Sequence, residues 1–208
     1  MVSHLGKLEY KQDIETDMLA FGGASISQHL SNNLITVEFL KSYDYLILQE
    51  KGGFTICFIE EDPNKIERCN EVYQAHLQIA KIAKGANVPV IYLGTYQFKQ
   101  HYSNVLVDSE KLITNEMGFE YVEVSSKFFN LFNKEDKTDL LNKDGWHPGK
   151  KLTWIMAKGI LDKISSLPNI KFESTCTDFR LFPPNSKFDS IVKNRDLNQL
   201  DKNEYWEK

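Results

Sequence analysis

The stretch Tyr43-Asp44-Tyr45-Leu46-Ile47-Leu48-Gln49 decides the fold class of this chain. Its centre is continuously apolar, a pattern that is typical of a parallel β-strand covered by helices on both faces. Lys51-Gly52-Gly53 then ends the strand, because adjacent glycines interrupt regular structure. The stretch therefore predicts a strand within an α/β domain.

Strand and helix patterns alternate around this stretch. Further strands are predicted at 17–21, 88–94 and 119–124. Helical patterns cover 62–84, 105–116, 125–132 and 150–164, and a loop runs into a helix over 24–30. Gly85 and Gly118 are expected to end the two longest helices before 119. This alternation predicts a mostly parallel sheet in an α/β sandwich.

The 208 residues are most simply one α/β domain over 1–165. After Ser165 the composition changes, with Pro168, Pro183-Pro184 and many Asn, Asp and Lys residues. We expect 166–208 to be an extension that wraps the domain or is partly disordered.

The net charge and the cysteines limit the kinds of partner and the cell compartment that we expect. A net charge of −4 provides no basic field for nucleic acid or an anionic membrane. The three cysteines are scattered and lack metal-ligand spacing, which favours free thiols in a reducing compartment such as the cytoplasm. Export with a leader that is absent from this sequence stays open. We expect no metal, because the five histidines lack suitable carboxylate spacing, and no other cofactor.

The candidate site is Asp144-Gly145-Trp146-His147-Pro148. Histidine suits proton transfer near neutral pH, and a neighbouring carboxylate fixes its tautomer and stabilises its protonated form. A surface turn is the alternative, because Asp, Gly and Pro are ordinary turn residues. Gly23, Gln49 and Gly94 also follow predicted strands, where sheets of this kind bind their ligands.

With these strands placed, residues 17–165 resemble the SGNH (GDSL-type) hydrolase superfamily of esterases and acyl hydrolases. Three blocks carry the resemblance: Phe21-Gly22-Gly23-Ala24-Ser25, Tyr43 to Gly53, and Asp144 to Pro148. The resemblance implies a three-layer flavodoxin-like sandwich. It also implies His147 as the base, Asp144 as its orienter, and Gly23 N–H with the Gln49 amide as oxyanion donors. Tyr96 and Trp146 are candidates for lining the substrate pocket, with simple packing as the alternative.

The chain departs from the family pattern at its start. The family's nucleophilic serine follows a first strand in a Gly-Asp-Ser or Gly-Asn-Ser turn, and nothing of that form precedes residue 17. Ser3 has the right chain order but no strand ahead of it, whereas Ser25 and Ser27 are better explained as helix-capping residues. Either residues 5–12 replace the first strand, a partner chain supplies it (for example in a homo-oligomer that covers the exposed sheet edge), or the chain is shortened.

Two functions follow from these residues. The first is a serine-type ester hydrolase for acyl or O-acetyl groups, with a small-molecule or glycan ester as substrate. The second is a catalytically inactive module of the same fold, a pseudoenzyme that binds a glycan or an acyl ligand. A flavin or nucleotide binder is disfavoured, because no phosphate-cradling glycine-rich loop follows a strand.

Overall fold

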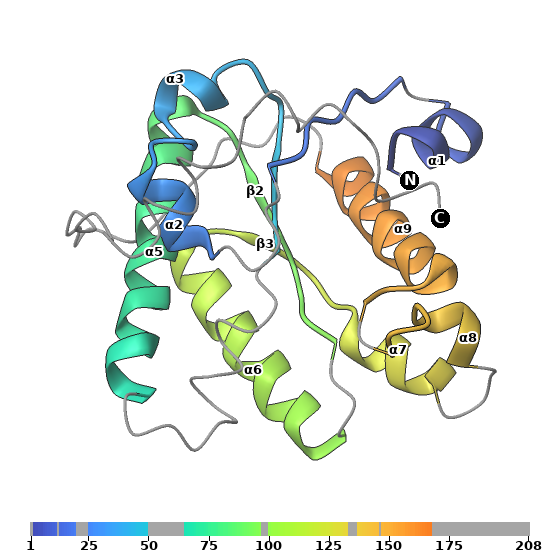
Figure 1. The fold of residues 1–208 in the computed structure, drawn as a ribbon. Helices are drawn as coiled ribbons and strands as arrows, with labels where there is room; N and C mark the ends of the chain where they lie inside the picture. The colour runs from blue at the N-terminus through green and yellow to red at the C-terminus, as the bar shows by residue number, and fades with distance from the viewer. Residues whose placement is uncertain are drawn as a thin grey trace.

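The computed structural model describes residues 2–11, 13–19, 25–49, 65–96, 100–132, 137–145 and 147–167. Within these ranges a three-stranded sheet has the order β1-β2-β3, formed by Leu46–Leu48, Val90–Leu93 and Glu120–Val122. Both strand pairs are parallel, with Leu48 opposite Tyr92 and Tyr92 opposite Tyr121. The predicted mixed α/β fold with a parallel sheet is therefore confirmed (Figure 1).

Helices surround this sheet. In chain order they are α1 (Val2–Glu9), α2 (Ile26–Ser31), α3 (Val37–Leu40), α5 (Lys65–Ala86), α6 (Gln100–Met117), α7 (Ser125–Phe132), α8 (Lys137–Leu140) and α9 (Lys150–Ser166). In Figure 1, α5 and α6 lie on one side of the sheet and α9 lies on the other. Among the described residues no helix is both long and apolar enough to cross a membrane.

The central strand β2 explains why helices cover both faces. Its side chains alternate between two apolar cores, as a period of two requires. Val90 and Tyr92 enter the core that contains α2, α3 and α5, whereas Ile91 and Leu93 enter the core that contains α7, α8 and α9. All four residues are buried, which accounts for the continuously apolar sequence of this strand.

The strand β1 is shorter and less covered than its sequence predicts. Regular pairing is limited to Leu46–Leu48, and β1 forms an edge of the described sheet. Ile47 lies opposite Ile91, on the α9 face, and is 37% exposed. The expectation that β1 is covered on both faces is therefore wrong at Ile47, because apolar sequence alone does not show which neighbours reach an edge strand.

Two predicted helix ends need correction. The long helix does not end at Gly85 but continues to Ala86, and Asn87 follows it with a φ of 58°. Asparagine can adopt this left-handed conformation, so it takes the terminating role expected of glycine. The next helix begins at Gln100 rather than near 105. The polar and aromatic residues 100–104 have the composition of a loop, yet they form the first turn of this helix. Its predicted end before Gly118 is confirmed.

The N-terminal segment also differs from the predictions. Residues 2–9 form the helix α1, so this segment does not replace a first strand. Residues 17–19 form no strand either, and Met18 is 67% exposed. The remainder of the predicted strand, residues 20 and 21, lies outside the described residues.

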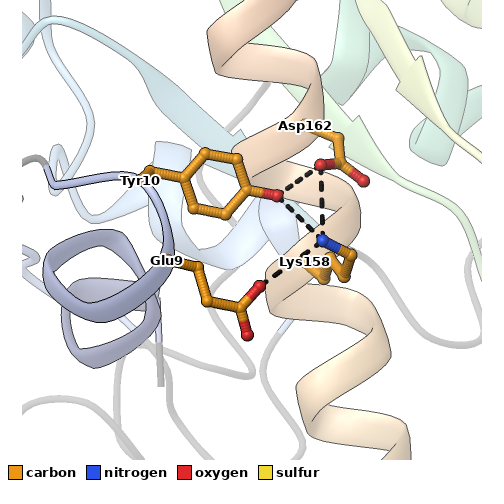
Figure 2. A network of polar contacts seen from close by, with 4 residues as sticks. All are labelled: Glu9, Tyr10, Lys158 and Asp162. Atoms are coloured by element: carbon orange, nitrogen blue, oxygen red, sulfur yellow. Dashed lines mark hydrogen bonds and ion pairs between the residues drawn. The ribbon is translucent and has the colours of Figure 1, made fainter.

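The helix α1 packs against α9. Leu5 is buried in a small core with Ala157 and Leu161. Figure 2 shows the polar contacts beside this core, in which the Tyr10 hydroxyl donates to Asp162 and the Lys158 ammonium contacts that hydroxyl at 3.2 Å. The apolar contacts and these polar contacts together fix α1 along the second half of α9.

The proposed C-terminal extension can be judged only at its beginning. The last helix is predicted over 150–164, and α9 spans Lys150–Ser166. Leu167, directly after it, is buried. Residues 168–208, and with them the expected wrapping or disorder, lie outside the described residues.

Candidate functional site

Asp144 holds His147 through two hydrogen bonds. One carboxylate oxygen, Oδ2, lies 2.6 Å from the imidazole Nδ1, and the other accepts the backbone N–H of His147 at 2.9 Å. A carboxylate at Nδ1 favours the tautomer with its proton on that nitrogen, which leaves the lone pair on Nε2. The pair therefore presents Nε2 as a proton acceptor.

The backbone between α8 and α9 shapes this turn. The N–H of Asn142 donates to the carbonyl of His147 at 2.9 Å, and Leu141 and Pro148 form an antiparallel bridge. Gly145 lies at the tip of the turn with a φ of 73°, a conformation that glycine adopts without a Cβ penalty. The chain thus returns on itself and places Asp144 and His147 side by side.

Both side chains of the pair reach solvent. The His147 side chain is 73% exposed and that of Asp144 is 47% exposed. Water screens an ion pair at such exposure, so its contribution to stability is small. Exposure also leaves the imidazole accessible to a dissolved molecule.

Tyr96 lies three residues after the end of β2. Its side chain is buried, and its ring lies 5.1 Å from that of Phe128 on α7. Burial, and then the negative charge of Asp144, raise the pKa of the Tyr96 phenol above its usual range. The charge of Asp144 therefore reaches Tyr96, which follows β2 at the carboxyl end of the parallel sheet.

The other predicted pocket and oxyanion residues are placed only in part. Gln49 directly follows β1 and is exposed. Because Leu48 pairs in parallel with Tyr92, Gln49 lies at the same carboxyl edge as the residues that lead to Tyr96. Gly23 and Trp146 lie outside the described residues.

Ser3 lies apart from the Asp144–His147 pair. It is on α1, where its hydroxyl lies 3.0 Å from that of Thr16. The helix α1 packs near Ala157 and Leu161, whereas His147 precedes the start of α9 at Lys150. With a rise of about 1.5 Å per residue, seven residues of α9 separate the two regions by roughly 10 Å along the helix. The contact recorded for the Ser3 hydroxyl is therefore with Thr16 and not with the imidazole.

Ser25 caps the helix α2, as predicted. It occupies the N-cap position, and its backbone N–H donates to the side-chain oxygen of Gln28 at 2.8 Å. Its hydroxyl lies 2.6 Å from that of Ser27. Ser25 thus starts the helix as its N-cap residue, whereas Ser27 lies within the helix and does not cap it.

A buried acid near the same sheet edge was not predicted. Glu110 on α6 has no exposed surface, and its carboxylate accepts the N–H of Thr95, the second residue after β2. Burial raises the pKa of Glu110 to about 7. A signal was present in the sequence: Glu110 shares a helical spacing with Ile113, Thr114 and Met117, so it falls on the inward face of the helix.

No group of three or more His, Cys, Asp or Glu residues in the described part of the chain is arranged to hold a metal ion. The polar groups at the carboxyl edge instead suit proton transfer and hydrogen bonding. In comparisons with known proteins, no family model matches the chain and no curated protein matches it.

Proposed function

We propose that this chain is a serine-type ester hydrolase of the SGNH kind, in which His147 is the base and Asp144 is its orienter. One observation carries the proposal: Asp144 contacts both Nδ1 and the backbone N–H of His147 at the carboxyl end of a parallel sheet. Helices on both faces of that sheet support the finer proposal of a three-layer flavodoxin-like sandwich.

The geometry of the pair suits acyl transfer. With the Nδ1 proton held by Asp144, Nε2 accepts the proton of an attacking hydroxyl. At the same time the oxygen of that hydroxyl bonds to the ester carbonyl carbon. The carbonyl oxygen carries the negative charge of the tetrahedral intermediate. Nε2 then returns its proton to the leaving alcohol as the ester C–O bond breaks, and the Asp144 carboxylate stabilises the imidazolium between the two transfers. Water then attacks the acylated hydroxyl with Nε2 again as the base, and the acid leaves as the hydroxyl regains its proton.

The remaining roles belong to the proposal alone. Gly23 N–H and the Gln49 amide would donate to the oxyanion, and Tyr96 and Trp146 would line the pocket for an acyl or O-acetyl group. The attacking hydroxyl has no identified residue. Ser3 is a poor candidate, because its hydroxyl contacts that of Thr16. The helix that carries Ser3, α1, packs against the second half of α9. The proposed compartment is a reducing one.

Hydrolysis of p-nitrophenyl acetate tests this proposal. His147→Ala and Asp144→Asn should each lower kcat/KM by about 100-fold or more, because general acid–base catalysis contributes on the order of 10²–10⁴. Asp13→Asn, which changes an exposed aspartate after α1, is the matched control and should leave the rate unchanged. Ser3→Ala should also keep the full rate. A His147→Ala variant as active as the natural chain would refute the proposal.

A non-catalytic binding module is the second candidate. The contact of the Ser3 hydroxyl favours it, because that contact is with Thr16 and not with His147. Isothermal titration with an O-acetylated oligosaccharide distinguishes the two functions. Saturable binding without any release of acetate would establish the module, whereas acetate release that depends on His147 would establish the hydrolase.

A further inference from the structure

Glu110 forms a buried hydrogen-bonded cluster at the carboxyl end of β2. Both of its carboxylate oxygens lie 3.2 Å from the backbone N of Thr95, and the Thr95 side chain also hydrogen-bonds to the carboxylate. The Tyr121 hydroxyl on β3 donates to Oε2 at 2.9 Å. One acid on α6 thus joins the segment after β2 to the neighbouring strand.

The charged groups around this acid do not neutralise it. Tyr121 faces it from β3, and Glu123, just after β3, adds a second negative charge that raises the pKa of Glu110 further after the effect of burial. The negative charge of Asp108 on α6 likewise raises the pKa of the Tyr121 phenol. A buried carboxylate is costly unless hydrogen bonds compensate it, so the contacts from Thr95 and Tyr121 are what hold it.

The same cluster restrains Gly94. A Cβ at this position would lie 2.5 Å from the Tyr121 hydroxyl oxygen, so a larger residue would displace the ring. The Tyr121 ring is further stacked on that of Tyr92, with centroids 6.3 Å apart. The backbone that leaves β2 is therefore held from the α6 face of the sheet by Tyr121 and Glu110.

The restrained segment leads directly to the candidate site. Thr95 is followed by Tyr96, whose ring enters the opposite core against Phe128, where the charge of Asp144 acts on its phenol. Consecutive residues of one extended segment thus contact Glu110 on one face and the neighbourhood of Asp144 on the other. A displacement of Thr95 must move Tyr96, because one peptide bond joins them.

We propose that Glu110 is a positioning residue that, by holding Thr95, sets the place of Tyr96 relative to Asp144. The catalytic consequence of this positioning rests on the proposed function, but the positioning itself does not. The protonation state of Glu110 then couples pH to the Thr95–Tyr96 segment. The Thr95 N–H has an acceptor in both states, and what changes is the charge on that acceptor.

Amide NMR spectra recorded from pH 5 to 9 test the positioning directly. In the natural chain and in His147→Ala, the Thr95 amide shift should titrate near pH 7, following Glu110 rather than the imidazole. Glu110→Gln keeps an acceptor oxygen but has no titrating charge, so the Thr95 titration should disappear. The Tyr96 and His147 amide shifts should move in the same variant.

Glu116→Gln is the matched control, because Glu116 is an exposed acid on the same helix that also accepts a tyrosine hydroxyl, that of Tyr73. It should leave all three amide shifts as they are in the natural chain. Unchanged Tyr96 and His147 shifts in Glu110→Gln would overturn the proposal.

Tyr121→Phe provides a second test if Glu110→Gln does not fold. It removes one donor from the carboxylate and keeps the ring, so the Thr95 titration should move to higher pH. An unmoved titration would overturn the proposal.

The activity measurement separates this proposal from the proposed function. If the natural chain hydrolyses p-nitrophenyl acetate, Glu110→Gln should lower kcat by about 10-fold with little change in KM, because a shift of Tyr96 that reaches Asp144 misplaces the His147 base, which loses rate rather than binding. An unchanged kcat would overturn the positioning role. An inactive natural chain would refute the hydrolase, and the NMR shifts would still decide whether Glu110 positions Tyr96.

Discussion

The Asp144 carboxylate is used twice within one tight turn, once on the imidazole and once on the backbone of His147. The second bond fixes the distance between the two residues, so the first does not depend on packing around an exposed side chain. This explains how a pair at the surface keeps a defined tautomer.

Gly145 should be required for this turn. Gly145→Ala should destabilise the fold by about 1 kcal/mol, because an L-residue in the left-handed region costs about 1–2 kcal/mol. A Cβ there would have nothing within 4 Å, so backbone strain alone would cause the loss. Urea unfolding measures the effect, with exposed Lys143→Ala as a control that stays within about 0.5 kcal/mol. Equal stability of both variants would contradict the prediction.

His76 should destabilise the fold in acid. Its ring is fully buried, and burial lowers its pKa from 6.5 to about 4. As the pH falls, His76 therefore gains its proton in the unfolded chain before it does so in the folded chain. The contribution of neutral His76 to the free energy of unfolding is fully present above pH 6.5 and is lost toward pH 4, by on the order of 3 kcal/mol. Urea unfolding of His76→Gln should show a smaller loss over that interval. An equal loss in both proteins would show that His76 does not titrate as expected.

Glu110 should act in the opposite direction. Burial raises its pKa from 4.5 to about 7, so the folded chain holds its proton longer than the unfolded chain. Its contribution to stability is complete below pH 4.5 and is lost as the pH rises to about 7. The difference in unfolding free energy between pH 5 and pH 8 should be smaller in Glu110→Gln, with Glu116→Gln unchanged from the natural chain. A Glu110→Gln variant that keeps the full pH dependence would contradict this.

The sequence predicted the Asp144–His147 pair but not the Glu110 cluster, for a physical reason. Asp144 and His147 are three residues apart, so a local turn suffices to join them. Glu110 meets Thr95 and Tyr121 only after a helix and two strands have packed, and a glutamate in a helix is usually solvated. Contacts of this kind become visible only in the folded chain.

At the scale of elements, α1 depends on α9. A helix of eight residues is marginal in isolation, so its apolar contacts must stabilise it. Its docking on α9 could not be predicted, because Leu5 and Leu8 look alike in the sequence, yet Leu5 is 5% exposed and Leu8 is 64% exposed.

Two leucines on α1 provide a matched test. Leu5→Ala should cost about 2–3 kcal/mol, the lower part of the range for buried leucine, because its core with Ala157 and Leu161 is small. Leu8→Ala should stay within about 0.5 kcal/mol. Thermal or urea unfolding of both variants measures the difference, and similar losses would mean that α1 does not depend on α9.

The predictions of helices and strands succeeded where the apolar pattern was long or was bounded by residues that interrupt regular structure. The helix α7 was predicted at its observed limits, 125–132, and β1, β2 and β3 were all found, although shortened at both ends. The short helices α3 and α8 were missed, because four residues are too few to show a helical period.

At the scale of the molecule, the parallel order β1-β2-β3 brings the segment after β2 and the turn before α9 to one edge. Alternating strands and helices predicted this arrangement, since the carboxyl ends of parallel strands share an edge. The exposure of Ile47 was not predictable, because it depends on how far α9 extends across the sheet. An ester hydrolase built on this edge needs the imidazole of His147 as its base.

The kcat/KM for p-nitrophenyl acetate, measured for the natural chain and for His147→Ala, tests that requirement most directly. The natural chain should hydrolyse the ester faster than buffer does, because the imidazole accepts a proton from the attacking hydroxyl. In His147→Ala kcat/KM should fall by about 100-fold or more. An equal kcat/KM in both proteins, or no hydrolysis above buffer in either, would contradict His147 as the base.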